Sequence, residues 1–469
     1  MAMPAGAKRE RRARLDEDGE EELVDRISRL PDDVLGNIVS FLPTVAGART
    51  QVLSSRWRPI WRSAPLNLDI RTDDVSRILS AHQGPGRRFC TEFSYFDPGD
   101  RSATLDGWLR SPALNNLQEL KFDLSFIPYQ ASPPLLPASV HRFSSTLRAA
   151  SFGGCAFPEG NGASPLHLPL LKQLSLLNVR ISETSFNALL AACPALQSLL
   201  LGYIMGCSRV QIVSQSLRSI GLLHTYCNLQ QLIIKDAPYL ERFFEGSAME
   251  VTVSVVSAPK LHVLALHSAY NLRHDVGSTT FQFRRTVFQR SCIPSSKTVV
   301  HSMKVIALTQ PDLCLDMVIN LLKCFPCLEK LYIETHKAGK KNTWCRQKYK
   351  NLIGTLEIRL KKIVLTNYRG NRSHFNFAKF FVLNARMLQS MRLELFDQNP
   401  RSTEIDRRRG RSTEIDRQRG RLLQIKKASR DILDVVAKNS CSLMLSIAFA
   451  EQVHDLSIAD PFVKLHNWK

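Results

Sequence analysis

A leucine-rich pattern, L-x-x-L-x-L, recurs between residues 117 and 393 and constrains the fold more than any other feature of this sequence. Most copies begin about 21 to 32 residues apart, with one shorter and one longer interval. A unit of this size cannot bury its apolar face alone, so such units have to stack on one another. The sequence therefore predicts a solenoid, built from LKQLSL (171), LQSLLL (196), LRSIGL (217), LQQLII (229), LHVLAL (261), LEKLYI (328) and LKKIVL (360), with weaker copies LQELKF (117), LRAASF (147), MKVIAL (303) and LQSMRL (388).

Two of these copies indicate what precedes each strand. LLAACPALQSLLL and LLKCFPCLEKLYI align Pro194 with Pro326, between the end of a helical apolar segment and the start of a strand. Residues at the fourth and sixth positions of a copy are expected to point into the stack, and those at the third and fifth positions to point out along its concave face. Each repeat is therefore expected to run helix, proline, strand.

The N-terminal part carries a different pattern. In LPDDVLGNIVSFLP, residues 30 to 43, apolar residues recur at helical spacing between two prolines, which predicts a helix of about three turns. A second apolar group, residues 45 to 53, and a segment with Trp57 and Trp61 add two further short helices. Three such helices bury too little surface to hide all these apolar side chains, so some of them are expected to need an outside partner.

The ordered strings RISRLPDDVLGNIVSFLP, RTQVLSSRWRPIW and SAPLNLDI resemble the F-box, the small helical module that binds a Skp-type adaptor in cullin-RING ubiquitin ligases. TVAGART departs from similar plant F-boxes, and Gly47 is expected to weaken the second helix by about 1 kcal/mol relative to alanine. The resemblance implies that ten residues contact the adaptor or form the core of the module, two roles that the sequence does not separate: Leu30, Pro31, Leu35, Ile38, Leu42, Val52, Leu53, Ser54, Arg56 and Trp57.

The repeats resemble plant leucine-rich repeats of the F-box class, and the segment from CFPCLEKLYIE to LQSMRLEL resembles the FBD region that commonly ends such chains. The expected fold is an α/β repeat fold: a three-helix F-box followed by an irregular leucine-rich-repeat solenoid shaped like a horseshoe. The expected boundaries are a disordered charged tail (1–22), the F-box (23–70), a linker or first irregular repeat (71–110), leucine-rich repeats (111–340), an FBD-like repeat region (341–398), a basic duplicated loop (399–422) and a C-terminal helix or strand cap (423–469).

The third and fifth strand positions are small, apolar and uncharged in the earlier repeats and basic with aromatic or apolar neighbours towards the end. An acidic or phosphorylated protein target would suit such a face. The alternative is a solvated basic face without a ligand, and a register error of one residue would exchange inside and outside. The residues expected to contact a target are Leu200, Ile233, Lys330, Tyr332, Lys362 and Arg392.

The formal net charge of +21 could attract nucleic acid, an anionic membrane surface or acidic proteins. Two clusters of basic residues stand out. KRERRAR (8–14) is a nuclear import signal or part of a disordered tail, and the tandem RSTEIDRRRGRSTEIDRQRGR (401–421) is a duplicated loop or a nucleic-acid arm. No apolar stretch reaches the roughly 18 residues of a membrane span. The expected location is therefore inside the cell, in the nucleus, the cytoplasm or both.

No pattern in the sequence points to catalysis. The eleven cysteines suit reduced, buried thiols, and the pair Cys324 and Cys327 has no second pair with which to share a zinc ion, so packing is preferred over a metal site. The sequence contains no H-E-x-x-H, G-x-S-x-G or phosphate-loop motif. We therefore expect no metal, no cofactor and no catalytic residue.

The resulting hypothesis is a non-catalytic substrate-recognition subunit of a Skp-cullin-F-box ubiquitin ligase. The F-box would bind the Skp-type adaptor, and through it the cullin-RING ligase, while the leucine-rich repeats bind a protein target. One alternative is a leucine-rich-repeat binding protein whose F-box is degenerate and which acts outside ubiquitination. A second is nucleic-acid binding through the net charge.

Overall fold

A computed structural model of the chain gives the arrangement of its elements. It describes residues 26–27, 29–42, 44–69, 74–93, 100–124, 132–159, 166–223, 229–246, 251–266, 272–273, 280–283, 286–289, 300–310, 313, 315–335, 357–368, 372–395 and 433–437.

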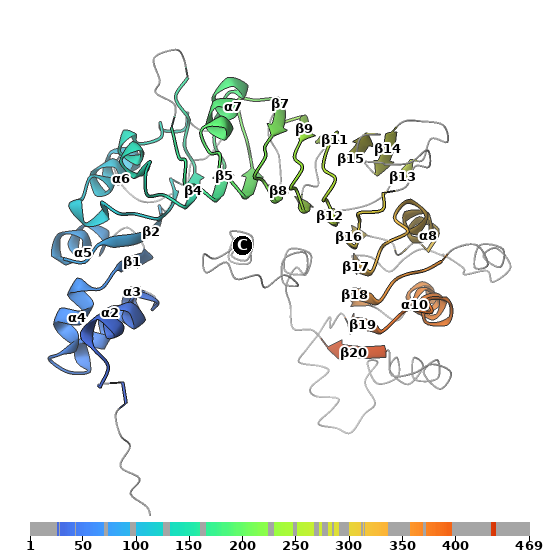
Figure 1. Cartoon of the computed structure of the whole chain (residues 1–469), viewed down its shortest axis with the longest axis horizontal. Coiled ribbons are helices and arrows are strands. Elements are labelled where there is room, and N and C mark those ends of the chain that lie inside the picture. Colours follow the sequence, from blue (N-terminus) through green and yellow to red (C-terminus); the bar gives the residue numbers. More distant parts are fainter. Residues whose placement is uncertain are drawn as a thin grey trace, which may run out of the picture.

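Fourteen strands lie side by side in one sheet, and the neighbouring strands pair in parallel. The sheet curves into an arc, with its strands along the inner side (Figure 1). This is the predicted horseshoe solenoid. Its strands, in spatial order, are β1 (Leu66–Asp69), β2 (Gly86–Glu92), β3 (Glu119–Asp123), β4 (Ala149–Gly153), β5 (Gln173–Leu177), β6 (Ser198–Gly202), β8 (Ser219–Leu223), β10 (Arg242–Gly246), β12 (Val263–Leu266), β16 (Val305–Gln310), β17 (Lys330–Thr335), β18 (Lys362–Tyr368), β19 (Ser390–Leu395) and β20 (Leu433–Ala437).

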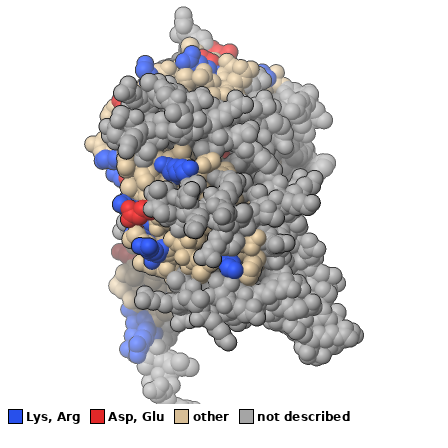
Figure 2. Space-filling view, turned by 90° about the vertical axis from the view of Figure 1, so that its right-hand side faces the viewer, with Lys and Arg blue, Asp and Glu red and all other residues tan. Residues whose placement is uncertain are grey.

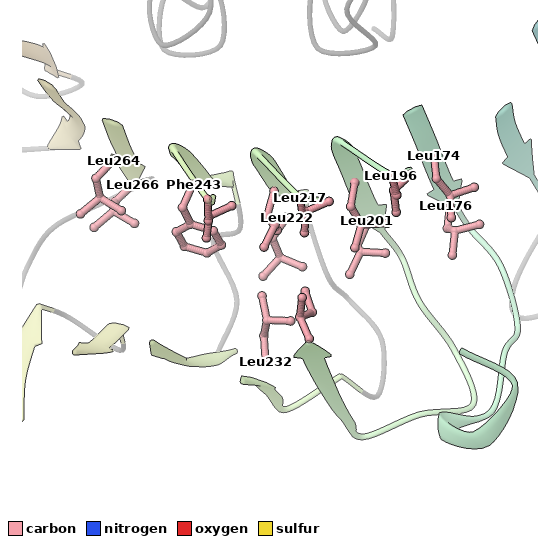
Figure 3. Packing of buried hydrophobic residues seen from close by; sticks show 14 of the residues in the cluster. Leu174, Leu176, Leu196, Leu201, Leu217, Leu222, Leu232, Phe243, Leu264 and Leu266 are labelled. Carbon is pink, nitrogen blue, oxygen red and sulfur yellow. The ribbon is translucent and has the colours of Figure 1, made fainter. Parts of the chain in front are cut away.

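The leucines of the repeat pattern form the core. Leu174 and Leu176 of β5 are fully buried, and the register pairs them with Leu199 and Leu201 of β6. Figure 3 shows Leu174, Leu176 and Leu201 among buried side chains that continue from strand to strand as far as Leu264 and Leu266. The fourth and sixth positions therefore point into the stack, as predicted, and each buried leucine contributes about 1.5–3 kcal/mol to stability.

Helices cover the outer side of the arc at both ends (Figure 1). Two of them begin at residues whose side chains accept hydrogen bonds from the first free backbone N–H groups: Asp100 precedes α6, and Ser182 precedes α7. The helices and 3₁₀ turns of the repeats are α5 (Val75–Ala81), α6 (Arg101–Leu109), η3 (Pro112–Leu114), η4 (Ala138–Phe143), α7 (Glu183–Ala191), α8 (Leu315–Cys324) and α10 (Arg372–Asn384).

A second sheet takes the place of helices in the middle of the arc. Its six strands, in order, are β13 (Leu272–Arg273), β14 (Thr280–Phe283), β15 (Thr286–Gln289), β11 (Thr252–Val255), β9 (Gln231–Asp236) and β7 (Arg209–Val213). The copy LQQLII forms β9 of this sheet, whereas β10 fills its expected place in the main sheet. The placement of Ile233 on the concave face was therefore wrong, because alternation predicts a strand but not the sheet to which it belongs.

The N-terminal module consists of α2 (Asp32–Ser40), α3 (Thr44–Arg49), η1 (Thr50–Val52) and α4 (Trp57–Ser63). Its core contains Leu35, Val39, Ile60 and Trp61, all at most 9% exposed. Gly47 of α3 lies against the Trp61 indole, and a Cβ at residue 47 would lie 2.5 Å from a ring carbon. The ring therefore occupies the space that an alanine methyl group would need, which opposes the gain expected from helix propensity.

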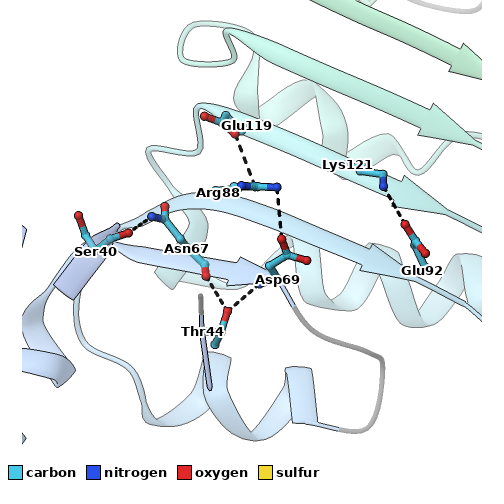
Figure 4. A network of polar contacts seen from close by, with 8 residues as sticks. All are labelled: Ser40, Thr44, Asn67, Asp69, Arg88, Glu92, Glu119 and Lys121. Carbon is cyan, nitrogen blue, oxygen red and sulfur yellow. Dashed lines mark hydrogen bonds and ion pairs between the residues drawn. The ribbon is translucent and has the colours of Figure 1, made fainter. Parts of the chain in front are cut away.

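The module is joined to the solenoid by hydrogen bonds as well as by chain connection. The Thr44 hydroxyl donates to the Asn67 carbonyl at 2.7 Å and accepts from the Asp69 N–H at 2.8 Å, and the Asn67 amide donates to the Ser40 carbonyl. Arg88 then links strands β1 and β3 through Asp69 and Glu119 (Figure 4). Strand β1 is thus both the end of the helical module and the first strand of the main sheet.

Candidate functional site

The helical module exposes an unusual number of large apolar side chains. Ile38 is 44% exposed, Leu53 66% and Val52 86%. Six such residues fall within residues 34–53, and a concentration of exposed apolar side chains marks interaction sites, whereas single exposed ones are common. The exposed apolar set, which we call the docking surface, is contributed by α2, α3, η1 and the residues that directly follow α2 and η1: Val34, Ile38, Phe41, Val45, Val52 and Leu53.

The structure separates the two roles that the resemblance left together. Leu35 is fully buried and Trp57 is 7% exposed, so both belong to the core of the module rather than to its surface, and their assignment as adaptor contacts is corrected. Leu30, Leu42 and Arg56 are half-buried. The remaining predicted contacts, which are exposed, are Pro31, Ile38, Val52, Leu53 and Ser54.

Arg56 holds the start of the first helix. Its guanidinium donates to the Leu30 carbonyl at 2.6 Å and forms an ion pair of 2.7 Å with Asp32. Because both ion-pair partners are more than a third exposed, we attribute little stability to the charges themselves. The contact instead fixes the position of the Leu30–Pro31 entry relative to α4.

Val34, Phe41 and Val45 belong to the docking surface but were not among the predicted contacts. Val34 and Val45 lie in the helical apolar pattern, and only burial shows that they point away from the core. Phe41 follows α2 and is 73% exposed, with the Arg87 guanidinium 5.7 Å from its ring centre. The signal available in the sequence was an aromatic residue directly after a short helix.

The concave side carries a second apolar cluster, separate from the core. It consists of Leu200, Phe244, Ala265, Ala307, Tyr332 and Val364, which lie along the main sheet from β6 to β18, with Gly221 of β8 between the first two. Leu200 and Tyr332 are 1% and 3% exposed, so they are not free contact surface in this structure, contrary to expectation. Among the other predicted target contacts, Lys330 and Lys362 are half-buried and Arg392 is exposed.

Carboxylates accompany the basic residues of this face. Glu394 is 5% exposed, accepts a hydrogen bond of 3.2 Å from the Thr366 hydroxyl and pairs with Arg392 at 3.1 Å. Lys362 lies 5.6 Å from the centre of the Tyr332 ring. The predicted basic patch therefore also contains buried carboxylates, Glu334 and Glu394, near the ends of strands whose cations lie nearer the start.

The described residues contain no group of three or more histidine, cysteine or carboxylate side chains that could hold a metal ion. Cys324 is buried, and Cys327 is half-buried at the corner before β17. A cavity of about 760 Å³ lies beside α5 and α6, and among its lining residues, which include His82, Gln83 and Trp108, none is charged. Burial lowers the pKa of His82 and favours its neutral ring. A hydrogen bond between the ring and the Ala64 carbonyl opposes this shift but is the smaller effect.

Where the structure describes the chain, no helix has both the length and the apolar character needed to cross a bilayer. On the face seen in Figure 2, the Lys and Arg side chains of the described residues form separate groups rather than one continuous basic surface. The basic clusters 8–14 and 401–421, and the expected tail and C-terminal cap apart from β20, lie outside the described residues.

A helical module with an exposed apolar surface, fixed to a curved leucine-rich solenoid, defines the structural class of this chain. Family models agree with this class: the F-box domain matches residues 27–69, the leucine-rich repeats of "FBD-associated F-box protein At5g56370" match residues 105–333, and FBD matches residues 347–393.

Several Arabidopsis thaliana proteins are similar in sequence. F-box/LRR-repeat protein 25 is 31% identical over 208 residues, which cover 41% of this chain and 73% of that protein. F-box/LRR-repeat protein At3g03360 is 31% identical over 41% of this chain and 40% of its own length, and putative F-box/LRR-repeat protein At5g02930 is 28% identical over 66% and 60%. The chain belongs to the F-box/LRR-repeat protein family, and it matches less than two thirds of the length of the last two relatives.

Proposed function

We propose that this chain is the substrate-recognition subunit of a Skp-cullin-F-box ubiquitin ligase. The observation that carries the proposal is the docking surface, because six large apolar side chains stay exposed on a module whose own core is already filled. A Skp-type adaptor that covers this surface would remove it from water, which is the main favourable term in such associations.

The structure supports a role that needs no catalytic residue. The hydrogen bonds of Thr44 and Asn67 tie the docking surface to β1, so a target held on the solenoid would keep a defined position relative to the ligase. Holding a target lysine near an activated ubiquitin raises its effective concentration, and this proximity is the whole contribution of such a subunit.

For the target, we propose the concave side near β17 to β19. Lys330 and Lys362 face each other across paired strands, with Arg392 on the next strand. These cations favour an acidic or phosphorylated segment. The carboxylates at the other ends of these strands would disfavour negative charge there, so the target is expected to be acidic along one side only.

Co-purification with a Skp-type adaptor tests the proposal and its main rival, an F-box protein that does not bind the adaptor. We expect a stoichiometric complex with the native chain, and loss of that complex when Leu30, Pro31 and Ile38 are all replaced by alanine. Absence of the complex with the native chain would favour the rival. Gly47 of TVAGART packs against Trp61 in the core of the module, which supports adaptor binding despite the departure of this segment from similar F-boxes.

A further inference from the structure

Cys327 differs from every other cysteine that the structure describes. Cys90, Cys155, Cys193, Cys207 and Cys324 are buried, whereas Cys327 is half-buried. Burial raises the pKa of Cys193 and Cys324 to about 12 and that of Cys207 to about 11, which disfavours the reactive thiolate at these positions. Among the six described cysteines, only Cys327 is accessible to a reagent.

Packing does not explain why a cysteine occupies this position. Cys327 directly precedes Leu328, the first leucine of its repeat, and the equivalent residue is Ala195 before Leu196 and Met387 before Leu388. Ala195 is half-buried and Met387 is 46% exposed, so this corner of the repeat accepts side chains of very different size. The thiol can therefore be replaced by alanine without loss of a buried contact.

The neighbouring repeats place two functional groups beside this thiol. Counting back from the paired residues Val305, Lys330 and Lys362, the register sets Cys327 between the segment containing His301 and the segment containing Arg359. The Cys327 sulfur lies 3.8 Å from His301 Nδ1, and the Arg359 guanidinium is close enough to interact with the same sulfur. We call these three residues, contributed by three consecutive repeats, the corner cluster.

Each neighbour has a chemical use. An imidazole nitrogen beside a thiol can accept its proton, which creates the nucleophilic thiolate. A guanidinium binds carboxylates, and the exposed Arg359 also pairs with Glu357 at 2.9 Å, so it is oriented at the surface. Lys361, two residues further on, pairs with Glu329 at 2.8 Å. The corner cluster therefore combines a nucleophile, a base and a cation at an accessible position.

We propose that Cys327 is a site of reversible S-thiolation by an anionic low-molecular-weight disulfide of the glutathione class. His301 Nδ1 takes the thiol proton, and the Cys327 sulfur attacks one sulfur of the disulfide. A new S–S bond forms as the old one breaks, and the displaced thiolate takes up a proton and leaves as a free thiol. Cys327 is oxidised and one half of the disulfide is reduced, so no further oxidant is needed.

The modification would change the charge of the neighbouring target surface. A bound glutathionyl group carries negative charge to a point three residues before Lys330, the first residue of β17. Arg359 would hold its carboxylate at the corner, where it competes with an acidic target for nearby cations. The modification itself does not depend on the proposed ligase function, because the corner cluster lies on the solenoid.

The test uses the purified full chain, glutathione disulfide as the probe, and peptide mapping by mass spectrometry to follow each cysteine. In the folded chain we expect Cys327 to be modified at least tenfold faster than the five buried cysteines named above. Unfolding in urea should abolish this difference, and reduced glutathione should reverse the modification. Equal rates at Cys327 and Cys193 in the folded chain would overturn the proposal.

Two substitutions test the neighbours separately from exposure. A free cysteine is a few per cent thiolate at pH 7, and a base raises that fraction, but a more acidic thiol is also a weaker nucleophile. His301→Gln should therefore lower the rate about threefold. Arg359→Gln should slow the reaction with glutathione disulfide severalfold but not that with cystamine, a cationic disulfide. Unchanged rates in both variants would refute the roles proposed for His301 and Arg359. Cys327→Ala is the control that assigns the modified peptide to Cys327. It introduces the side chain that Ala195 has at the equivalent corner, so the variant should keep the native melting temperature.

Discussion

Replacing Val52 and Leu53 together with alanine should weaken adaptor binding strongly without unfolding the chain. The two changes remove two and three carbon atoms from side chains that are 86% and 66% exposed. At about 0.8 kcal/mol per carbon, multiplied by the exposed fraction that complete burial in the complex would remove from water, the loss is about 3 kcal/mol. The adaptor Kd should therefore rise roughly 150-fold.

Isothermal titration calorimetry with a purified Skp-type adaptor measures this change directly. Because both side chains are exposed in the free chain, the free energy of unfolding should stay within about 0.5 kcal/mol of its original value. Leu135→Ala is the matched control, since Leu135 is 62% exposed but lies in the repeats, and its Kd should be unchanged. A Kd for the double variant within threefold of the native value would refute the placement of the docking surface.

Three further changes test the joints and the core. Gly47→Ala should lower the free energy of unfolding by about 1–3 kcal/mol, as measured by urea denaturation, because the added methyl group meets the Trp61 ring, whereas helix propensity alone predicts a gain. Thr44→Val should cost about 1–3 kcal/mol in the same assay, because it leaves the Asn67 carbonyl and the Asp69 N–H of β1 without their hydrogen bonds to the buried hydroxyl. Since burial lowers the pKa of His82, the unfolded chain takes up its proton first, and stability should fall as the pH drops below about 6.5. In His82→Gln this part of the pH dependence should disappear, and its persistence would show that other groups cause it.

Much of the solenoid could be predicted from the sequence because its alternation has one physical cause. Leucines at the fourth and sixth positions point to the same side of each strand, and that side is buried in every repeat, so the pattern reports both strand and core. The sheet to which a strand belongs has no such signal. LQQLII has the same alternation as its neighbours yet forms β9 of the second sheet. Strand β10 was missed because Phe243 and Glu245 take the inward positions there.

The candidate site was predicted less completely, because the sequence does not reveal which apolar side chains of a short helix point into the core and which point to the surface. Leu35 and Ile38 both fit the helical stripe of α2, but one is fully buried and the other is 44% exposed. The difference depends on where α4 and β1 pack, and a single helix does not contain that information. Gly47 is a second example, because the effect of a side chain at this position depends on the Trp61 indole, fourteen residues away in the sequence.

Hydrogen–deuterium exchange of the full chain, with and without a Skp-type adaptor, tests the central claim most directly. We predict that the adaptor slows backbone exchange between residues 30 and 57, while the repeats from β5 to β19 exchange at unchanged rates. Protection confined to the concave side of the solenoid, or no change in exchange at saturating adaptor, would contradict the claim that the exposed apolar side chains of the helical module are a binding surface.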